Sequence, residues 1–132
     1  MNNIINAFNS KQSLICGEGL DDIQIEKAER ELNLRFAEEY KKYLKEFGLA
    51  SFDGYEFSGI GCVERLNVVS MTQEAKKNNR LVPDDFYVIE DVGIDYIMLW
   101  QNNMGQIFET QYNSIPRKIY DSFADYINSI TD

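Results

Sequence analysis

The chain has 132 residues, of which 44% are hydrophobic, and 13 basic against 22 acidic residues give it a formal net charge of −9. This length and hydrophobic content are those of one globular domain with its own core. The sequence contains no histidine, which excludes Ser-His-Asp and Cys-His catalysis and removes the commonest ligand of transition metals. The acidic balance disfavours nucleic-acid binding, because contacts with phosphate need clusters of basic residues.

The sequence also indicates a compartment. No apolar run approaches the ~18 residues that cross a bilayer, and the N-terminal segment lacks the basic start and long apolar stretch of a signal peptide. Cys16 and Cys62 are far apart and have no histidine to accompany them. We therefore expect two reduced, packed thiols rather than a disulfide or a metal site, and a cytoplasmic protein without a cofactor.

The first third of the chain is predicted to form helices. Apolar residues at positions 4, 5 and 8 share one face of a short N-terminal helix. Asp21 and Gln24 have the spacing of a capping box, and apolar residues at positions 25, 28 and 32 then recur at helical intervals. The next helix places apolar residues at positions 40, 43, 44 and 47, and Gly48 suits the residue that ends it. These last two helices should form a helical hairpin.

The middle of the chain changes character. Segment 51–66 mixes aromatic residues with three glycines, which is typical of short strands joined by tight turns. Ser70 and Gln73 again have the spacing of a capping box, so a short helix is expected over residues 71–79.

Three more strands are expected over residues 86–90, 96–100 and 106–110. The second is apolar on both faces, which is typical of a covered central strand, so Trp100 at its end should lie in the core. A short polar link joins the second strand to the third as an antiparallel hairpin. A helix capped at position 121 or 122 ends the chain. The order predicts an α+β fold in a single domain: a largely antiparallel mixed sheet, an N-terminal helical hairpin, a short middle helix and a C-terminal helix packed on the sheet.

The acidic residues are unevenly distributed. Segments 46–64 and 81–116 hold ten acidic residues and neither lysine nor arginine, whereas the rest of the chain holds 12 acidic and 13 basic residues. The simpler interpretation is an acidic surface that keeps the protein dispersed. The sharper hypothesis is an acidic face that steers a basic protein partner. The candidate partner contacts are Asp53, Tyr55, Glu56, Asp84, Asp85, Glu90, Asp91, Asp95 and Tyr96.

Other readings of these carboxylates are weaker. Glu90, Asp91 and Asp95 lack the spacing of a calcium loop, so a solvated turn is favoured over a metal site. Asp53 and Glu56 would serve a glycosidase only across a sugar-sized cleft, and sequence alone does not supply that geometry. No catalytic residue is therefore assigned.

The pattern of residues resembles the SUKH superfamily. Residues 25–61 are similar to its first half, in which an acidic amphipathic helix, a second helix with Tyr and Leu, a glycine break and an aromatic-rich strand pair follow one another. Residues 86–100 resemble its strand, Gly/Asp turn and strand unit, residues 105–108 the strand that follows, and residues 123–127 its closing helix. One departure is Phe36-Ala37, where members usually carry Leu-Pro. The matching positions in the first half are Glu29, Leu32, Phe36, Tyr40, Leu44 and Gly48.

This resemblance implies a binding protein without enzymatic activity. Bacterial members are typically immunity proteins that bind the toxic domain of a polymorphic toxin, often a nuclease, and eukaryotic relatives include a yeast regulator of cell-wall assembly. We therefore expect an immunity protein whose partner is a basic toxin C-terminal domain, with neither nucleic acid nor membrane as partner. The alternatives are a regulatory or scaffold domain without a toxin and, less favoured, a carboxylate-dependent hydrolase. A homodimer remains open.

Overall fold

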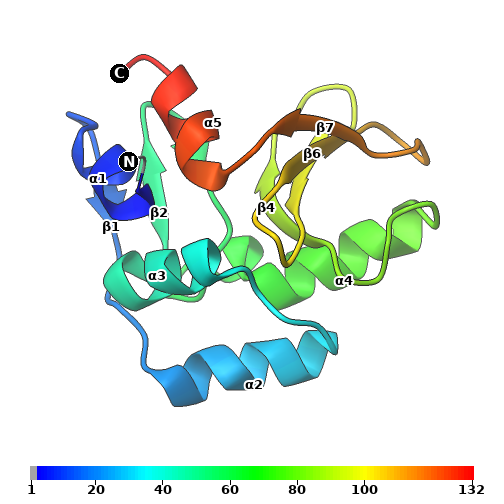
Figure 1. The fold of residues 1–132 in the computed structure, drawn as a ribbon, viewed down its shortest axis with the longest axis horizontal. Coiled ribbons are helices and arrows are strands. Elements are labelled where there is room, and N and C mark those ends of the chain that lie inside the picture. Colours follow the sequence, from blue (N-terminus) through cyan, green and yellow to red (C-terminus); the bar gives the residue numbers. More distant parts are fainter. Residues whose placement is uncertain (1–2) are drawn as a thin grey trace.

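The computed structural model describes residues 3–132 as an α+β fold, which confirms the predicted fold class. The strands form two antiparallel sheets, a three-stranded one in the order β1-β2-β3 and a four-stranded one in the order β4-β5-β6-β7. In Figure 1 the small sheet lies at the left and the large sheet at the right, with helices beside, beneath and between them. The strands are thus divided between two sheets, where the sequence suggested one.

Three helices form the first part of the fold: α1 (Ile4–Asn9), α2 (Asp22–Leu32) and α3 (Glu38–Phe47). The predicted capping box of α2 is confirmed, because Asp21 Oδ1 accepts from the Gln24 N–H at 2.9 Å and Gln24 Oε1 accepts from the Asp21 N–H at 3.1 Å. The predicted apolar face of α3 is also confirmed. Its four residues, all buried, are Tyr40, Tyr43, Leu44 and Phe47.

The small sheet consists of β1 (Ile15–Cys16), β2 (Ala50–Phe52) and β3 (Tyr55–Glu56). Asp53 and Gly54 join the last two strands and have φ values of 47° and 81°. Positive φ at both central residues is what a type I′ hairpin turn requires, and Asp-Gly is a favoured pair there. The tight turn expected in this segment is therefore present.

The large sheet consists of β4 (Tyr87–Asp91), β5 (Met98–Gln101), β6 (Ile107–Thr110) and β7 (Arg117–Tyr120). β5 lies between β4 and β6 and pairs with both in antiparallel register, so its predicted central place and its hairpin with β6 are confirmed. The edge strand β7 was not predicted. It is short and half-exposed, and its two basic residues carry no strand pattern.

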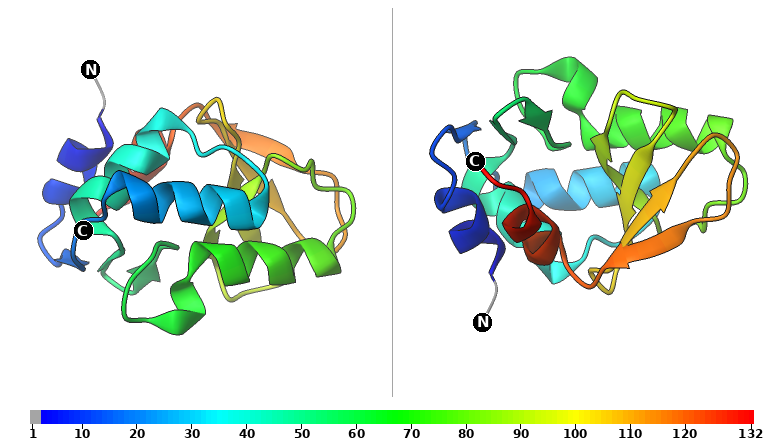
Figure 2. Two further views of the ribbon diagram at one scale, coloured as in Figure 1. Left: turned by 90° about the horizontal axis from the view of Figure 1, so that it is seen from below. Right: turned by 90° about the horizontal axis from the view of Figure 1, so that it is seen from above.

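The middle helix α4 (Val68–Asn78) follows a 3-10 turn at Glu64–Leu66. Its N-cap is Asn67, whose side chain accepts from the backbone N–H groups of Val69 and Ser70. The helix was expected, but its cap was placed three residues too late. α4 lies beside α2 in the left-hand view of Figure 2 and packs against β4.

The C-terminal helix α5 (Phe123–Ser129) begins at the predicted cap, because the Ser122 side chain accepts from the Asp125 N–H. A second anchor comes from α3, where Glu39 accepts from the first two N–H groups of α5 at 2.8 and 2.9 Å. Glu39 also accepts from Gln101 Nε2 at 2.8 Å. One half-buried carboxylate therefore ties α3, α5 and β5 together.

Both faces of the large sheet are packed, each against a different cluster. One face contributes Tyr87, Ile89 and Leu99 to the main core, which also contains buried residues of α1, α3 and α5. The other face contributes Val88 and Trp100 to a second, smaller cluster, which Met71 and Ala75 of α4 cover in part. Trp100 is fully buried, as predicted. Because α4 covers only part of this second face, the rest is available to line a surface site.

Cys16 and Cys62 are free thiols, and both are exposed. The expectation that they pack in the interior is wrong, since Cys16 lies on the exposed edge strand β1 and Cys62 in the bend before the 3-10 turn. In the part of the chain from residue 3 onward, no helix combines the length and the apolar character needed to cross a membrane.

Candidate functional site

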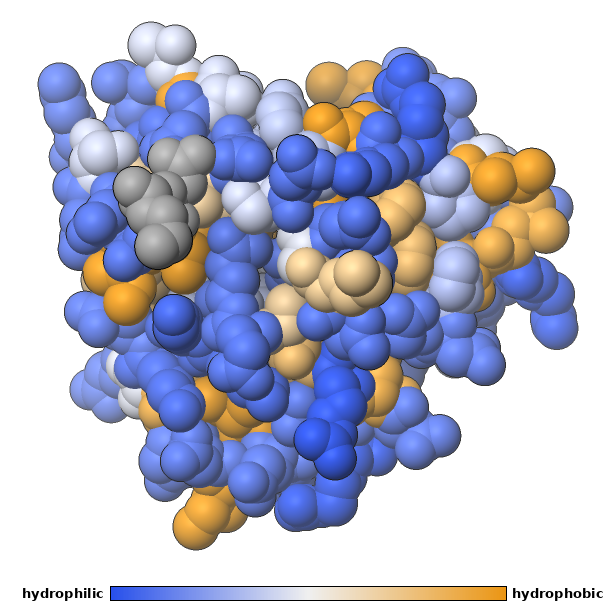
Figure 3. Space-filling view, in the orientation of Figure 1, coloured by the Kyte–Doolittle hydropathy of each residue, from blue (hydrophilic) through white to orange (hydrophobic). Residues whose placement is uncertain are grey.

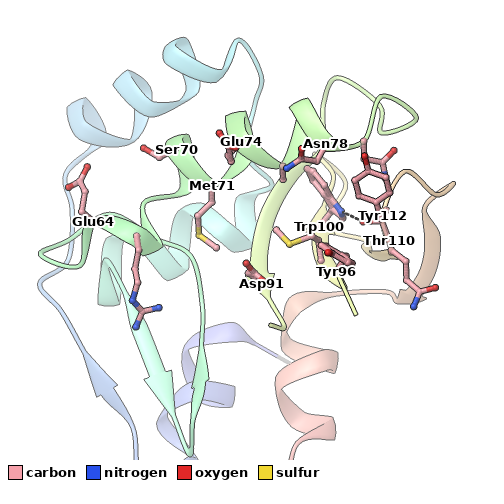
Figure 4. A pocket seen from close by; sticks show the side chains of 15 residues that line it. Glu64, Ser70, Met71, Glu74, Asn78, Asp91, Tyr96, Trp100, Thr110 and Tyr112 are labelled. Carbon is pink, nitrogen blue, oxygen red and sulfur yellow. Dashed lines mark hydrogen bonds between the residues drawn. The ribbon is translucent and has the colours of Figure 1, made fainter. Parts of the chain in front are cut away.

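A groove of about 470 Å³ lies between α4 and the second face of the large sheet. Its floor is apolar: α4 contributes Met71 and Ala75, and β5 contributes Met98 and Trp100. Figure 4 shows Met71 pointing from α4 toward the strand side of the groove. Trp100 is fixed in the floor because its Nε1–H donates to Thr110 Oγ1 at 2.8 Å. The groove therefore has an apolar floor in which the Trp100 side chain is held in place.

Two exposed aromatic side chains stand at the groove's rim. Tyr96 is 77% exposed and Tyr112 is 65% exposed. Their ring centroids lie 5.8 Å apart at 62°, an edge-to-face contact between the β4–β5 and β6–β7 loops. Tyrosine presents a large apolar ring with a polar tip and is enriched at protein interfaces. A pair of tyrosines held together at the edge of a groove suits the binding of another molecule.

The backbone holds Tyr96 outward in a strained turn. Asp95 and Tyr96 have φ values of 53° and 59°, and the Ile97 N–H donates to the Ile94 carbonyl at 3.0 Å. Positive φ at both central residues is the requirement of a type I′ turn, in which glycine is favoured at the second position. A Cβ in this left-handed region costs about 1 kcal/mol. The chain therefore carries a tyrosine where folding alone favours glycine.

The rim of the groove is acidic. Three acidic residues line it, Glu64, Glu74 and Asp91, against one basic residue, Arg65. The guanidinium of Arg65 is already engaged, because it donates to both carboxylate oxygens of Glu56 at 2.9 and 2.7 Å. This hydrogen-bonded arginine holds the pKa of the Glu56 carboxyl below its usual value. Arg65, the basic residue of the lining, is therefore neutralised by Glu56, which lies outside the groove lining.

The other charges near the rim are weakly engaged. Glu74 makes an ion pair with Lys77 at 3.7 Å between two exposed side chains, which contributes little in water. Asp91 Oδ1 accepts from the Gly93 N–H at 2.9 Å, which orders the turn after β4. No lysine or arginine among residues 3–132 pairs with Asp91 or Asp95. These carboxylates remain available to an external cation.

A bulge in β4 decides where its two acidic residues point. Glu90 pairs with Leu99, and Asp91 pairs with Met98. Directly opposed residues share a face of the sheet, so Glu90 faces the core with Leu99 while Asp91 faces the groove with Met98. Glu90 is 4% exposed and accepts a hydrogen bond from the Tyr126 hydroxyl of α5. Burial raises the pKa of Glu90 to about 7.

Exposed apolar side chains continue beyond the groove. Leu81 and Ile115 are largely exposed on the α4–β4 and β6–β7 loops, which are joined where Asn79 Nδ2 donates to the Ser114 carbonyl at 2.9 Å. Figure 3 shows hydrophobic residues at the right-hand edge of the molecule, where Figure 1 places these two loops. The apolar surface thus extends past Tyr112 to the end of the sheet.

A second hollow, of about 640 Å³, lies between α2 and α3 and has a different character. Its lining holds four acidic and four basic residues, and several are paired, as Lys45 with Asp22 at 2.8 Å and Lys41 with Glu29 at 3.9 Å. Its charges cancel and its walls are polar. We therefore take the groove beside α4 as the candidate functional site.

A comparison with protein families identifies the family. The family model SUKH_5, described as SMI1-KNR4 cell-wall, matches residues 1–132, the whole chain. The chain belongs to the SUKH superfamily. This confirms the resemblance found in the sequence. No curated protein gives a significant match.

The structure of this SUKH chain separates the predicted contacts into distinct places. Asp91 and Tyr96 line the groove, and Asp95 lies beside Tyr96 in the strained turn. Asp84 and Asp85 lie in the link that follows α4, close enough to Lys76 for their charges to raise its pKa against the larger lowering by burial. Only three of the nine candidates therefore gather at one site.

Two other predicted contacts lie on the hairpin of the small sheet, and a further two are already engaged. Asp53 occupies the β2–β3 turn, and Tyr55 is exposed on β3. Glu56 is engaged by Arg65. Glu90 requires a correction: its carboxylate is buried against Tyr126, so it does not reach the surface as a partner contact. The bulge shifts the alternation of side chains in β4 by one residue, so the Glu90 side chain points into the core and not toward the groove.

Several residues that line the groove of this SUKH protein were not identified from the sequence. Met71 and Glu74 of α4, and Met98 of β5, belong to elements that were predicted, but their shared groove depends on how helix and sheet pack. Tyr112 carried a usable signal. It is an aromatic residue in a polar link, Gln111 to Ser114, and a loop aromatic without a core partner points to an interface.

Proposed function

We propose that this SUKH protein is an immunity protein that binds a cognate toxin domain and neutralises it by direct contact. The observation that carries the proposal is the acidic groove with its exposed Tyr96–Tyr112 pair above an apolar floor. Such a surface combines aromatic anchors with unpaired carboxylates. Membership of the SUKH superfamily supports a binding role, because the bacterial immunity proteins of that superfamily act by binding toxins.

The partner we propose is a basic domain of the nuclease type. A protein that acts on nucleic acid carries positive charge to hold phosphates. An acidic protein gains association rate with such a partner through long-range attraction. The net charge of −9 and the carboxylates around the groove supply that attraction.

We propose binding rather than catalysis. A glycosidase needs two carboxyl groups that flank one scissile bond. The groove's carboxylates come from three elements, and Figure 4 shows Glu64, Glu74 and Asp91 spread along its length. This arrangement suits several contacts with an extended cationic surface.

The direct experiment is co-expression with the cognate toxin domain. Cells that produce the toxin domain alone should stop growing, and cells that also produce this protein should grow. A toxin domain inactivated in its own active site is the control for expression burden. Equal loss of viability with and without this protein contradicts the proposed function.

The family description favours one alternative, a regulatory or scaffold domain of cell-wall assembly, because the matched model is described as SMI1-KNR4 cell-wall. Deletion of the gene in a strain that lacks the cognate toxin gene separates the two functions. The immunity function predicts unchanged sensitivity to cell-wall inhibitors in that strain. Increased sensitivity supports the alternative.

A further inference from the structure

We infer that the groove beside α4 binds an arginine side chain of the partner, with the guanidinium between the Tyr96 ring and the Asp91 carboxylate. This inference rests on the proposed function in taking the partner to be a basic protein. It adds the binding site and the chemistry of the residue that is recognised there. The aliphatic stem of the arginine lies over Met98 and Met71 in the floor.

The walls of the groove match the parts of an arginine. The Tyr96 ring is 77% exposed, so a face is available for a cation, and a cation over an aromatic ring contributes about 0.5–2 kcal/mol. The Asp91 carboxylate lies in the same lining and has only the Gly93 N–H as a partner among residues 3–132. Figure 4 shows Asp91 at the middle of the groove and Tyr96 to its right, below Trp100.

The groove favours arginine over lysine. Guanidinium is planar, more weakly hydrated than ammonium, and stacks on aromatic faces while it donates to a carboxylate. The floor of methionine and tryptophan side chains offers no hydrogen-bond acceptors that could replace the strong hydration of an ammonium group. Its one polar group is the Trp100 N–H, which already donates to Thr110. An ammonium group therefore loses more on entering the groove.

Other occupants fit the groove less well. A purely apolar side chain leaves the carboxylates of Glu64 and Asp91 without a cation. A nucleotide or other anion is repelled by the same groups. A second copy of this chain brings another −9 charge toward the groove. Charge complementarity thus selects a cationic partner.

The test uses the full chain and three short peptides. The first is acetylated and amidated Gly-Ile-Arg-Ile-Gly. The second replaces arginine with citrulline, which keeps the shape and loses the charge, and the third replaces arginine with lysine. Trp100 is the chain's one tryptophan and forms part of the floor. Its fluorescence therefore reports binding in the groove, and calorimetry gives the affinity independently.

We expect the arginine peptide to bind at least about tenfold more tightly than the citrulline peptide, since a charge-assisted hydrogen bond and a cation–π contact are lost together. The lysine peptide should lie between them. Asp91→Asn keeps the acceptor for the Gly93 N–H and should remove most of the preference for arginine. Glu18→Gln, an exposed substitution in the link between β1 and α2, should leave it unchanged.

Three results overturn the inference: equal affinity for arginine and citrulline, no binding of either peptide, or an unchanged preference in Asp91→Asn. Self-association that Tyr96→Gly abolishes also overturns it, because a second copy then occupies the groove. These results are separable from the proposed function. Loss of toxin protection with intact arginine binding contradicts immunity alone, and protection without arginine binding contradicts this site alone.

Discussion

Tyr96 is the residue at which folding and binding are most clearly opposed. Its φ of 59° follows that of Asp95 at 53°, so the pair occupies a turn that favours Asp-Gly. Its side chain is 77% exposed and has one ring contact, with Tyr112. The Tyr96 ring adds little to the stability of the fold. Backbone strain that is retained at such an exposed residue suggests a role in binding.

Replacement of this tyrosine by glycine should therefore stabilise the protein. We expect Tyr96→Gly to raise the free energy of unfolding by up to about 1 kcal/mol, because glycine adopts the left-handed region without strain. Urea unfolding measures the change. Tyr112→Gly is the matched control, since Tyr112 has no positive φ, and it should bring no gain. A destabilised Tyr96→Gly variant contradicts the strain argument.

Glu90 should make stability depend on pH. Its folded-state pKa of about 7 lies above the ordinary value of 4.5, because of burial. The folded protein thus keeps a proton that the unfolded chain releases. This contribution is fully present below pH 4.5 and is lost as the pH rises through 7; a shift of this size corresponds to at most ~3 kcal/mol.

Glu90→Gln keeps a neutral acceptor for the Tyr126 hydroxyl. We expect the variant to be more stable than the wild type at pH 8 and of equal stability near pH 4. Thermal unfolding across this range measures the difference. Because Glu39 also has a pKa raised by burial, the comparison of variant and wild type isolates Glu90. A difference that does not change with pH contradicts this assignment.

At the scale of elements, the sequence predicted helices better than strands. α2 and α3 have strong apolar periodicity and recognisable ends, and both were located correctly. β7 was missed because an edge strand of four residues that begins with Arg117 and Lys118 has little alternation. The start of α4 was misplaced because Ser70 and Gln73 have the spacing of a capping box, whereas the residue that caps the helix is Asn67.

The residues of the groove were predicted only in part. Asp91 and Tyr96 were singled out from the sequence, and both line the groove. The inward turn of Glu90 was not foreseen, because a bulge shifts the alternation by one residue and sequence gives no sign of it. The contribution of α4 depends on tertiary packing, which periodicity does not describe.

The N-terminus of α4 provides a test at this scale. Asn67→Ala removes the side chain that accepts from the Val69 and Ser70 N–H groups at 2.9 and 3.1 Å, and we expect a loss of about 1 kcal/mol of stability. Ser70→Ala is the control and should change stability little, since Ser70 is exposed within the helix. Equal effects of the two substitutions in chemical denaturation contradict the assigned cap.

At the scale of the whole molecule, the charges divide the surface into two kinds of hollow. The hollow between α2 and α3 has balanced, paired charges, whereas the groove beside α4 has three carboxylates and one neutralised arginine. The acidic excess of the sequence is not gathered wholly at one site, because Glu56 is engaged by Arg65, Glu109 by Arg117, and Glu90 is buried. The acidic residues that remain at the groove are those that a basic partner contacts.

The central claim is that these groove carboxylates steer a basic partner to the Tyr96–Tyr112 surface. The measurement that tests it is the association rate with the toxin domain, followed by stopped flow between ~0.05 and ~0.5 M salt. The matched variants are Asp91→Asn with Asp95→Asn at the groove, and Glu18→Gln with Glu26→Gln, which removes two exposed charges elsewhere.

We predict that the wild-type rate falls steeply with salt, that the groove variant associates more slowly at low salt with a flatter salt dependence, and that the distant variant stays close to the wild type. Equal rates and equal salt slopes for the groove variant and the wild type contradict the claim.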